Sequence, residues 1–258
     1  MNCLRKPIIA AEPFPPWVGE DGLQDIDLVI FDCDGVLVDS EVLAVRVTAA
    51  QLEEIGVSMS FEETLEVFMS LGPDAARRQI EIESGITLPA DFRETTGRRM
   101  KEAFPRELRP IAGIENILVQ LTTPYCVASN SSHARLRETF EIIGFTPFFE
   151  GRVFSAEDVA RRKPAPDLFL HAASRMGDVD PARCLVIEDS TTGVAAARAA
   201  GMRVIGFCGG GHIRDGHDRR LLELGAEGVA RACEALSQTL RLGGASCPDA
   251  LADLSSTG

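Results

Sequence analysis

Residues 28–35 read LVIFDCDG: four apolar residues followed abruptly by Asp32, Cys33 and Asp34. A run that is apolar at every position is typical of a strand buried on both faces, as in a parallel sheet. Ligands of open α/β sheets bind beyond the carboxyl ends of such strands, where the two aspartates would lie. We therefore interpret this run as a central strand and the aspartates as candidate functional residues.

Four further segments look similar to the first and are predicted to be strands, at 125–128, 152–154, 184–187 and 203–207. Helical patterns lie between them, at 134–143, 167–176 and 194–200, and each ends at or just before a glycine. Strands that alternate with helices form βαβ units. The sequence therefore predicts an α/β fold with a doubly wound parallel sheet.

A long helical insertion separates the first strand from the second. About ninety residues carry only helical patterns, at 41–55, 61–71, 74–83 and 92–104, whereas an ordinary βα connection is much shorter. We expect a helical cap subdomain at 40–110 that acts as a lid. The remaining parts would be an N-terminal extension at 1–26, a core at 27–39 and 111–246, and a flexible tail at 247–258.

The composition of the 258 residues excludes several classes of protein. Hydrophobic residues make up 45% and charged residues 25%, which is ordinary for a soluble globular protein. The net charge of −13 argues against a nucleic-acid partner, which would need a basic face. No apolar run approaches the ~20 residues of a membrane span, so we expect no membrane partner.

The first residues and the cysteines favour a cytoplasmic protein. The prolines at 7, 13, 15 and 16 interrupt the segment where a signal peptide would need a continuous apolar core. Seven cysteines are present without a C-x-x-C pair, and several lie in the apolar strand-like runs. Buried free thiols in a reducing compartment explain this pattern better than disulfides or zinc ligands.

Polar residues follow the predicted strands at the edge where a ligand would bind. Asp32 and Asp34 follow the first strand, Ser129 and Asn130 the second, and Glu188 and Asp189 the fourth; Lys163 precedes the helix that leads to the fourth. Acids after strands often only cap helices, and a single D-x-D is weak evidence. Four ordered signals at one sheet edge are much stronger evidence for a site.

The charges of these residues indicate phosphoryl transfer. Two carboxylates about 4 Å apart in a partly buried site repel each other by about 4 kcal/mol, so four acids need a cation. Oxygen ligands without histidine or cysteine favour Mg²⁺ over Zn²⁺. A lysine, a serine hydroxyl and helix N–H groups suit a phosphate. A remaining carboxylate could act as a nucleophile and form an aspartyl-phosphate.

The chain resembles the haloacid dehalogenase (HAD) superfamily of phosphohydrolases in four motifs, which occur in the family's order. They are FDCDGVLVDSE at 31–41, VASN at 127–130, KPAPD at 163–167 and VIEDSTTG at 186–193. The resemblance spans about residues 27–206, with the helical insertion where the family's cap belongs. Within the superfamily, the chain is similar to the β-phosphoglucomutase-like subgroup with a helical cap, which includes 6-phosphogluconate phosphatase.

The resemblance implies a role for each motif residue. Asp32 would be the nucleophile and a Mg²⁺ ligand. Asp34 would be the general acid and base, and its backbone carbonyl would also bind Mg²⁺. Lys163 would bridge Asp32 and the phosphate and offset their charges.

The other two motifs would complete the phosphate and metal sites. Ser129 and the N–H of Asn130 would bind the phosphoryl oxygens. Asp189 would bind Mg²⁺, with Glu188 as a direct or water-mediated ligand.

Two other activities of the superfamily are disfavoured. Its dehalogenases lack an acid at the position of Asp34. Its phosphonate hydrolases use a cap lysine to form a Schiff base, and the only lysine of this cap, Lys101, lies away from that position. A non-catalytic metabolite-binding protein is the alternative outside enzymes, but no motif residue is missing.

A sugar phosphomutase is the alternative within the family. The related mutase has a G-x-S-R cap loop, whereas the matching loop at 71–75 reads LGPDA and has no arginine. Arg77 or Arg78 could substitute, or could be solvated surface charges. Arg46, on the first cap helix, could likewise face the substrate or the solvent. We list Arg46 and Arg77 as candidate substrate-binding residues and favour a phosphatase.

The glycine-rich segment 209–217 follows the fifth predicted strand and contains His212 and His217. It lacks the G-x-x-x-x-G-K-[ST] pattern of a phosphate-binding loop, so we interpret it as a flexible loop near the mouth of the site. The sequence as a whole predicts a monomeric, cytoplasmic, Mg²⁺-dependent phosphatase. Its partner would be a small phosphorylated metabolite, such as a sugar phosphate or a sugar-acid phosphate.

Overall fold

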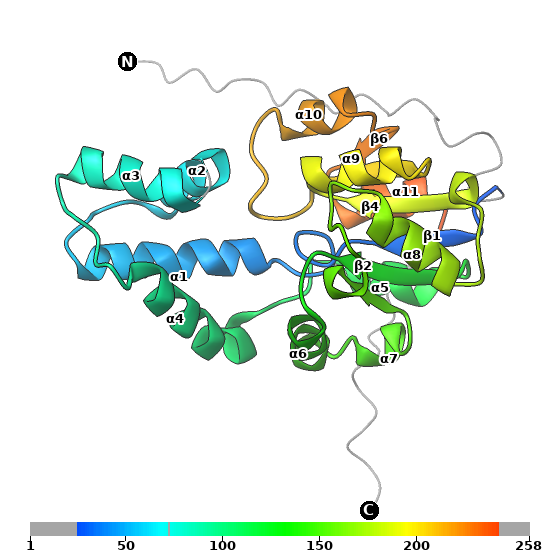
Figure 1. Ribbon diagram of the computed structural model, residues 1–258, viewed down its shortest axis with the longest axis horizontal. Helices are drawn as coiled ribbons and strands as arrows, with labels where there is room; N and C mark the ends of the chain where they lie inside the picture. The colour runs from blue at the N-terminus through cyan, green and yellow to red at the C-terminus, as the bar shows by residue number, and fades with distance from the viewer. Residues whose placement is uncertain (1–24, 72, 243–258) are drawn as a thin grey trace, which may run out of the picture.

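A six-stranded parallel sheet forms the centre of the computed structural model, which describes residues 25–71 and 73–242. The strand order is β3-β2-β1-β4-β5-β6, with β1 in the interior of the sheet (Figure 1). The strands are β1 (Leu28–Phe31), β2 (Tyr125–Ser129), β3 (Val153–Ser155), β4 (Cys184–Glu188), β5 (Arg203–Phe207) and β6 (Gly228–Ala230). The prediction of a doubly wound parallel sheet is confirmed.

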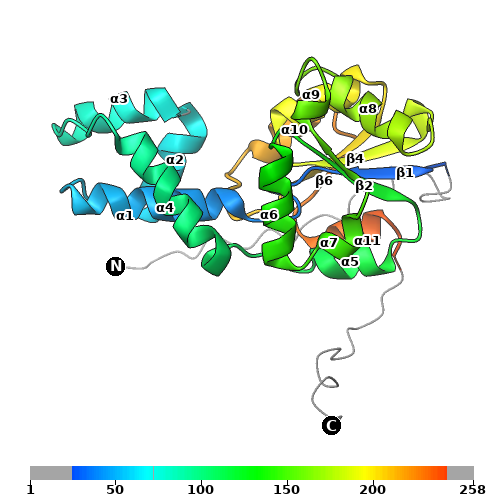
Figure 2. The ribbon, with the colours of Figure 1, turned by 60° about the horizontal axis from the view of Figure 1, so that its bottom comes forward.

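Helices cover both faces of the sheet, as Figure 2 shows. Val29 and Phe31 of β1 pack into one hydrophobic cluster, and Leu28 and Ile30 into the other, because successive side chains of a strand point to opposite faces. One cluster includes residues of α5 (Ile114–Gln120), α6 (His133–Ile143), α7 (Thr146–Phe149) and α11 (Cys233–Thr239). The other includes residues of α8 (Asp167–Arg175), α9 (Thr191–Ala199) and α10 (His217–Glu223).

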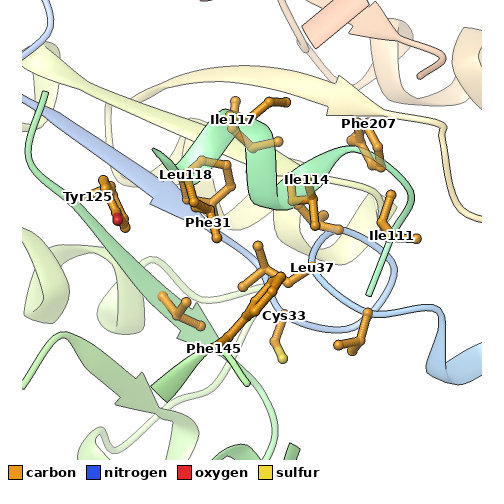
Figure 3. Close-up of a cluster of buried hydrophobic side chains, with 14 of the residues drawn as sticks. Phe31, Cys33, Leu37, Ile111, Ile114, Ile117, Leu118, Tyr125, Phe145 and Phe207 are labelled. Atoms are coloured by element: carbon orange, nitrogen blue, oxygen red, sulfur yellow. The ribbon is translucent and has the colours of Figure 1, made fainter. Parts of the chain in front are cut away.

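The segment after β1 turns back into the first of these clusters. Cys33 and Leu37 lie there with Phe31 and Ile114 (Figure 3), and Cys33 is only 1% exposed. The prediction that Cys33 packs in the core and points away from the site is confirmed. The five cysteines within the described residues are free thiols, four of them buried.

Four helices form a separate group beside the sheet (Figure 1). They are α1 (Ser40–Glu54), α2 (Phe61–Leu71), α3 (Pro73–Ser84) and α4 (Phe92–Glu107). Leu52, Ile80, Leu88 and Phe92 form a small hydrophobic cluster of their own within this group. We propose that the group is the predicted cap; its division from the core at residues 40 and 110 stays a prediction.

Several expected boundaries differ from those observed. α4 continues three residues past its expected end at 104 and includes Pro105 in its last turn. β6 and the helices α5, α7, α10 and α11 were not expected. The predicted extension, up to residue 24, and the predicted tail at 247–258 lie outside the described residues. Among the described helices, none has the length and apolar character needed to cross a bilayer.

Candidate active site

The predicted site residues meet at the carboxyl edge of the sheet. Phe31 of β1 pairs with Val127 of β2 and with Ile187 of β4, so the residues that follow these positions lie side by side. They surround a small pocket of about 180 Å³. Its lining residues are Asp32, Asp34, Glu41, Ser129, Asn130, Ser131, Lys163, Glu188, Asp189 and Ser190.

Lys163 lies at the centre of the pocket's polar contacts. Its Nζ donates hydrogen bonds to Asp32 Oδ1 at 2.6 Å, to Glu188 Oε1 at 2.8 Å and to the Ala128 carbonyl at 2.8 Å. These three bonds use all three donors of the ammonium group. The side chain is 3% exposed, so the two ion pairs are buried.

Burial shifts the pKa values of the site's charged groups. It raises the pKa of Asp32 well above its usual value; Lys163 opposes this shift, and the charges of Glu188 and Asp189 reinforce it. Burial also raises the pKa of Asp189, and Glu188 adds to that shift. Burial alone would lower the pKa of Lys163, but the carboxylates of Asp32 and Glu188 outweigh it and raise that pKa. The pocket therefore holds more negative charge than one lysine balances.

The residues present fit a divalent cation. Asp32, Glu188 and Asp189 offer oxygen atoms that all lie within 4.8 Å of one another, and all three residues are buried. Oxygen donors without sulfur or nitrogen are the ligand set that Mg²⁺ prefers. The carboxylate of Asp34 is not part of this group.

Two serine hydroxyls orient Asp34. Ser40 Oγ donates to Asp34 Oδ1 at 2.5 Å, and Ser131 Oγ donates to Asp34 Oδ2 at 2.9 Å. Ser40 is the first residue of α1, so this carboxylate contacts the beginning of the proposed cap as well as the segment after β2. Asp34 is thereby fixed close to Asp32 but separate from the acidic group.

The end of β2 and the residues after it supply several polar groups to the pocket. Ser129 is 2% exposed, and its Oγ accepts a hydrogen bond from the Ser131 N–H at 3.1 Å. The side chain of Asn130 brackets the backbone of Lys163: Oδ1 accepts from the Lys163 N–H at 3.1 Å, and Nδ2 donates to the Lys163 carbonyl at 3.3 Å. Asn130 therefore fixes the segment that carries the buried lysine.

Glu188 is held at both of its carboxylate oxygens. Oε1 accepts from Lys163, and Oε2 accepts from the Ser190 N–H at 2.9 Å and from Ser190 Oγ at 2.8 Å. Ser190 is the N-cap of α9, where its Oγ accepts from the Gly193 N–H. The capping residue thus links the start of α9 to an acid of the site.

The structure does not bring Arg46 and Arg77 to the pocket. Arg46 is exposed on α1. The guanidinium of Arg77 donates to the carbonyls of Leu88 and Pro89 and forms an ion pair with Glu81 at 3.1 Å. These contacts fix the segment between α3 and α4, which explains the presence of Arg77 without a ligand.

Sequence reasoning assigned no role to several residues of the site. Glu41, Ser131 and Ser190 line the pocket, and each directly follows a motif position or belongs to a quoted motif. His212, from the segment after β5, lies with Nε2 2.9 Å from Asp189 Oδ2 and is only 8% exposed. The available signal was the run of three glycines before His212, which begins two residues after the end of β5 at the same edge of the sheet.

A second, larger cleft of about 1250 Å³ lies beside the pocket, between the helical group and the segment after β5. Glu62, Glu63 and Glu83 line it from α2 and α3, and Arg214 and Arg220 line it from the other side. His212 lines this cleft and contacts Asp189, so it connects the cleft to the pocket.

Known proteins are similar to this chain in sequence and in fold. The 6-phosphogluconate phosphatase of Escherichia coli K12 is 33% identical over 188 residues, which cover 72% of this chain and 85% of that protein. A haloacid dehalogenase-like protein from Agrobacterium tumefaciens is 40% identical, with a TM-score of 0.73 over 84% of this chain and 98% of that one.

A HAD family hydrolase from Deinococcus radiodurans, whose crystal structure contains phosphate and sodium, is 31% identical, with a TM-score of 0.77. The similarity covers 86% of this chain and 99% of that one. Residues 29–207 match the family model of haloacid dehalogenase-like hydrolases. The chain therefore belongs to the haloacid dehalogenase-like hydrolase family, which confirms the resemblance found in its motifs.

Proposed function

We propose that this protein is a Mg²⁺-dependent phosphatase that hydrolyses a small phosphorylated metabolite through an aspartyl-phosphate on Asp32. One observation carries the proposal: Asp32 is buried against the ammonium of Lys163 and lies beside Asp34, which belongs to a separate, serine-bound environment. A nucleophile and an acid–base group need such different surroundings, because one must stay ionised while the other exchanges a proton.

In the first half of the reaction, a carboxylate oxygen of Asp32 attacks the phosphorus atom. The bond between phosphorus and the ester oxygen breaks, and Asp34 transfers its proton to that oxygen as the alcohol leaves. The hydroxyl of Ser129 and the N–H of Asn130 would bind the phosphoryl oxygens, where negative charge accumulates, and the ammonium group of Lys163 beside Asp32 would offset that charge.

In the second half, Asp34 accepts a proton from water as the water oxygen attacks the phosphorus of the aspartyl-phosphate. The bond between phosphorus and the Asp32 oxygen breaks, which releases inorganic phosphate and restores the Asp32 carboxylate. We expect the hydrogen bonds from Ser40 and Ser131 to keep Asp34 in place during both halves of the reaction.

Asp32, Glu188 and Asp189 would hold the Mg²⁺ ion, together with the backbone carbonyl of Asp34. When bound, the ion supplies positive charge that keeps these buried carboxylates ionised and that balances the phosphoryl oxygens. The raised pKa values of Asp32 and Asp189 support this part of the proposal, because both groups need additional positive charge to ionise.

A small sugar phosphate or sugar-acid phosphate is the substrate class we propose. The small pocket beneath the helical group favours a small substrate, and a relative named 6-phosphogluconate phosphatase supports a sugar acid. A phosphomutase is disfavoured because Arg77, a candidate to bind a second phosphate, is engaged by backbone carbonyls of its own helical group. The free thiols of the described cysteines support a cytoplasmic location.

The test is phosphate release from a panel of phosphorylated sugars, sugar acids and nucleotides, including 6-phosphogluconate and β-glucose 1-phosphate, with Mg²⁺ and with EDTA. We expect Mg²⁺-dependent release by the wild type and a loss of at least about 10³-fold in Asp32→Asn, because the amide is not a nucleophile. Mass spectrometry of the quenched wild type should find phosphate on the peptide that contains Asp32.

The circular dichroism spectrum and thermal melting of Asp32→Asn are the controls for folding. Release of phosphate by folded Asp32→Asn at a rate near that of the wild type would refute the mechanism. Conversion of β-glucose 1-phosphate to glucose 6-phosphate without net phosphate release would show that the protein is a phosphomutase and not a phosphatase.

A further inference from the structure

The segment 208–217, which runs from the end of β5 to the first residue of α10, contacts Asp189 at two points. His212 Nε2 lies 2.9 Å from Asp189 Oδ2, and His217 Nε2 lies 2.6 Å from the Asp189 carbonyl oxygen. The side chain and the main chain of a candidate metal ligand are therefore both bound by imidazoles from the same segment. None of the four sequence motifs includes these histidines.

Two glycines form a slot for the imidazole of His212. A Cβ atom on Gly35 would lie 2.9 Å from His212 Cε1, and one on Gly210 would lie 2.7 Å from His212 Nδ1. The Gly35 carbonyl is also close, 3.2 Å from that second Cβ position. Any larger residue at either position would displace the ring, so the backbone on both sides is shaped around this histidine.

The 2.9 Å contact with Asp189 Oδ2 places the proton of His212 on Nε2. A carboxylate that binds a cation has no proton to donate, so the imidazole must be the donor in the contact with Asp189. His212 Nδ1 is, among the described residues, the buried side-chain nitrogen or oxygen that lacks a partner. An unprotonated Nδ1 leaves only an unused acceptor there, whereas a protonated one would leave a buried donor unpaired. The contact with Asp189 is thus the polar interaction that the His212 imidazole makes.

We propose that His212 is a positioning residue of the cation site, an inference that rests on the metal site of the proposed function. A hydrogen bond donated across the 2.9 Å between His212 Nε2 and Asp189 Oδ2 would fix the rotation of this carboxylate, which contributes an oxygen to the acidic group formed with Asp32 and Glu188. Groups that orient a metal ligand in this way raise its affinity for the ion without touching the ion.

The test compares two replacements of His212 that differ in one property. His212→Leu fills the slot but cannot donate, whereas His212→Gln carries an amide N–H close to the position of Nε2. Binding of Mn²⁺, which takes the same oxygen ligands as Mg²⁺, is titrated on the purified full chain by electron paramagnetic resonance. We expect the dissociation constant to rise about 10-fold or more in His212→Leu and less than about 3-fold in His212→Gln.

Two further variants separate this inference from its premise. His171 is a half-buried histidine on α8 that packs against Phe154 of β3 and does not line the pocket. His171→Leu should therefore leave the dissociation constant for Mn²⁺ unchanged. Asp189→Asn should lose Mn²⁺ binding. Melting temperatures of all variants are recorded, because a purely structural role of His212 would lower the melting temperature of His212→Leu without changing its affinity for Mn²⁺.

The outcomes are distinguishable. Wild-type affinity in His212→Leu, with binding lost in Asp189→Asn, would overturn the role of His212 and leave the metal site intact. Equal weakening in His212→Leu and His212→Gln would overturn the hydrogen bond as the cause. Absence of Mn²⁺ binding by the wild type would overturn both the inference and the metal site on which it rests.

Discussion

Lys163 provides the positive charge that pairs with two buried carboxylates of the pocket. It places an ammonium group between Asp32 and Glu188 in a region where burial disfavours every charge. Removing one partner of a buried ion pair leaves an uncompensated charge, which costs about 3–5 kcal/mol. Here two carboxylates would lose the same partner at once, so Lys163 stabilises the fold as well as the proposed chemistry.

Lys163→Met tests this role in the metal-free protein. We expect a loss of about 3–5 kcal/mol in the free energy of unfolding at pH 8, measured by urea denaturation in EDTA. Burial raises the pKa of Asp32 above its usual value near 3.8, so above that pH the folded state retains a proton that the unfolded chain has released. The free energy of unfolding therefore falls as the pH rises through the raised pKa. Without Lys163 this fall should be larger, and the variant should recover most of its stability near pH 4.

Lys101→Met is the matched control, because Lys101 is exposed on α4. It should change the free energy of unfolding by less than about 0.5 kcal/mol at either pH. A deficit in Lys163→Met that is the same at pH 4 and pH 8 would show that lost packing, rather than unpaired carboxylates, causes the destabilisation.

At this scale the sequence predicted the residues that belong to ordered motifs at strand ends. Asp32, Asp34, Ser129 and Asp189 line the pocket because the carboxyl ends of parallel strands meet at one edge of the sheet, and Lys163 reaches the same pocket from the loop before α8. Their chemical roles stay predictions.

Side chains whose direction depends on tertiary packing could not be placed from the sequence. Arg77 is engaged by the carbonyls of Leu88 and Pro89, eleven and twelve residues away, and His212 reaches Asp189 across more than twenty residues. Periodicity contains no information on such contacts.

The connection between β1 and α1 illustrates how one element positions the site. Gly35 has a φ of +83°, and a Cβ atom there would lie only 2.0 Å from Asp189 Oδ2. Gly144, which follows α6, has a similar φ of +74° but no atom within 4 Å of a Cβ position. Both glycines therefore adopt a positive φ, but only at Gly35 would an added Cβ atom collide with a neighbouring side chain.

Gly35→Ala and Gly144→Ala separate these two effects. Both pay the strain of a left-handed conformation, about 1–2 kcal/mol in the free energy of unfolding. Gly35→Ala must also displace Asp189, so we expect a loss of phosphatase activity of about 10²-fold or more, against less than about 2-fold in Gly144→Ala. Urea denaturation and steady-state kinetics measure the two quantities. Full activity in Gly35→Ala would mean that Asp189 moves without consequence for the reaction.

Whether the sequence predicts a whole element depends on the length of the element and on its apolar pattern. The run at 28–31, which is apolar throughout, coincides with β1, and the run at 203–207, which is apolar after Arg203, coincides with β5. β6 has only three residues, Gly228–Ala230, and α7 only four, so neither spans enough positions to establish a period. Such short elements are fixed by neighbours in the fold, in the case of β6 by pairing with β5.

For the whole molecule, the contacts between the helical group and the core differ between the two sides. On one side the guanidinium of Arg135 on α6 stacks on the ring of Phe104 on α4, with 3.6 Å from Cζ to the ring centroid. On the other side, α2 and α3 face the segment after β5 across the large cleft. A cap that pivots near the packed side would close the open one, where acidic helices face Arg214 and Arg220.

Charge reversal across this cleft tests whether cap closure contributes to turnover. In Arg214→Glu/Arg220→Glu, like charges would oppose closure, so we expect kcat/KM to fall about 5- to 10-fold at low ionic strength, from about 1 kcal/mol or slightly more of lost attraction. The deficit should shrink in about 0.3 M NaCl, because salt screens exposed charges. Arg219→Glu is the control, since Arg219 neighbours Arg220 on α10 but does not line the cleft. An equal, salt-independent loss in both proteins would place the effect in net charge or stability, and the cap would not close by this attraction.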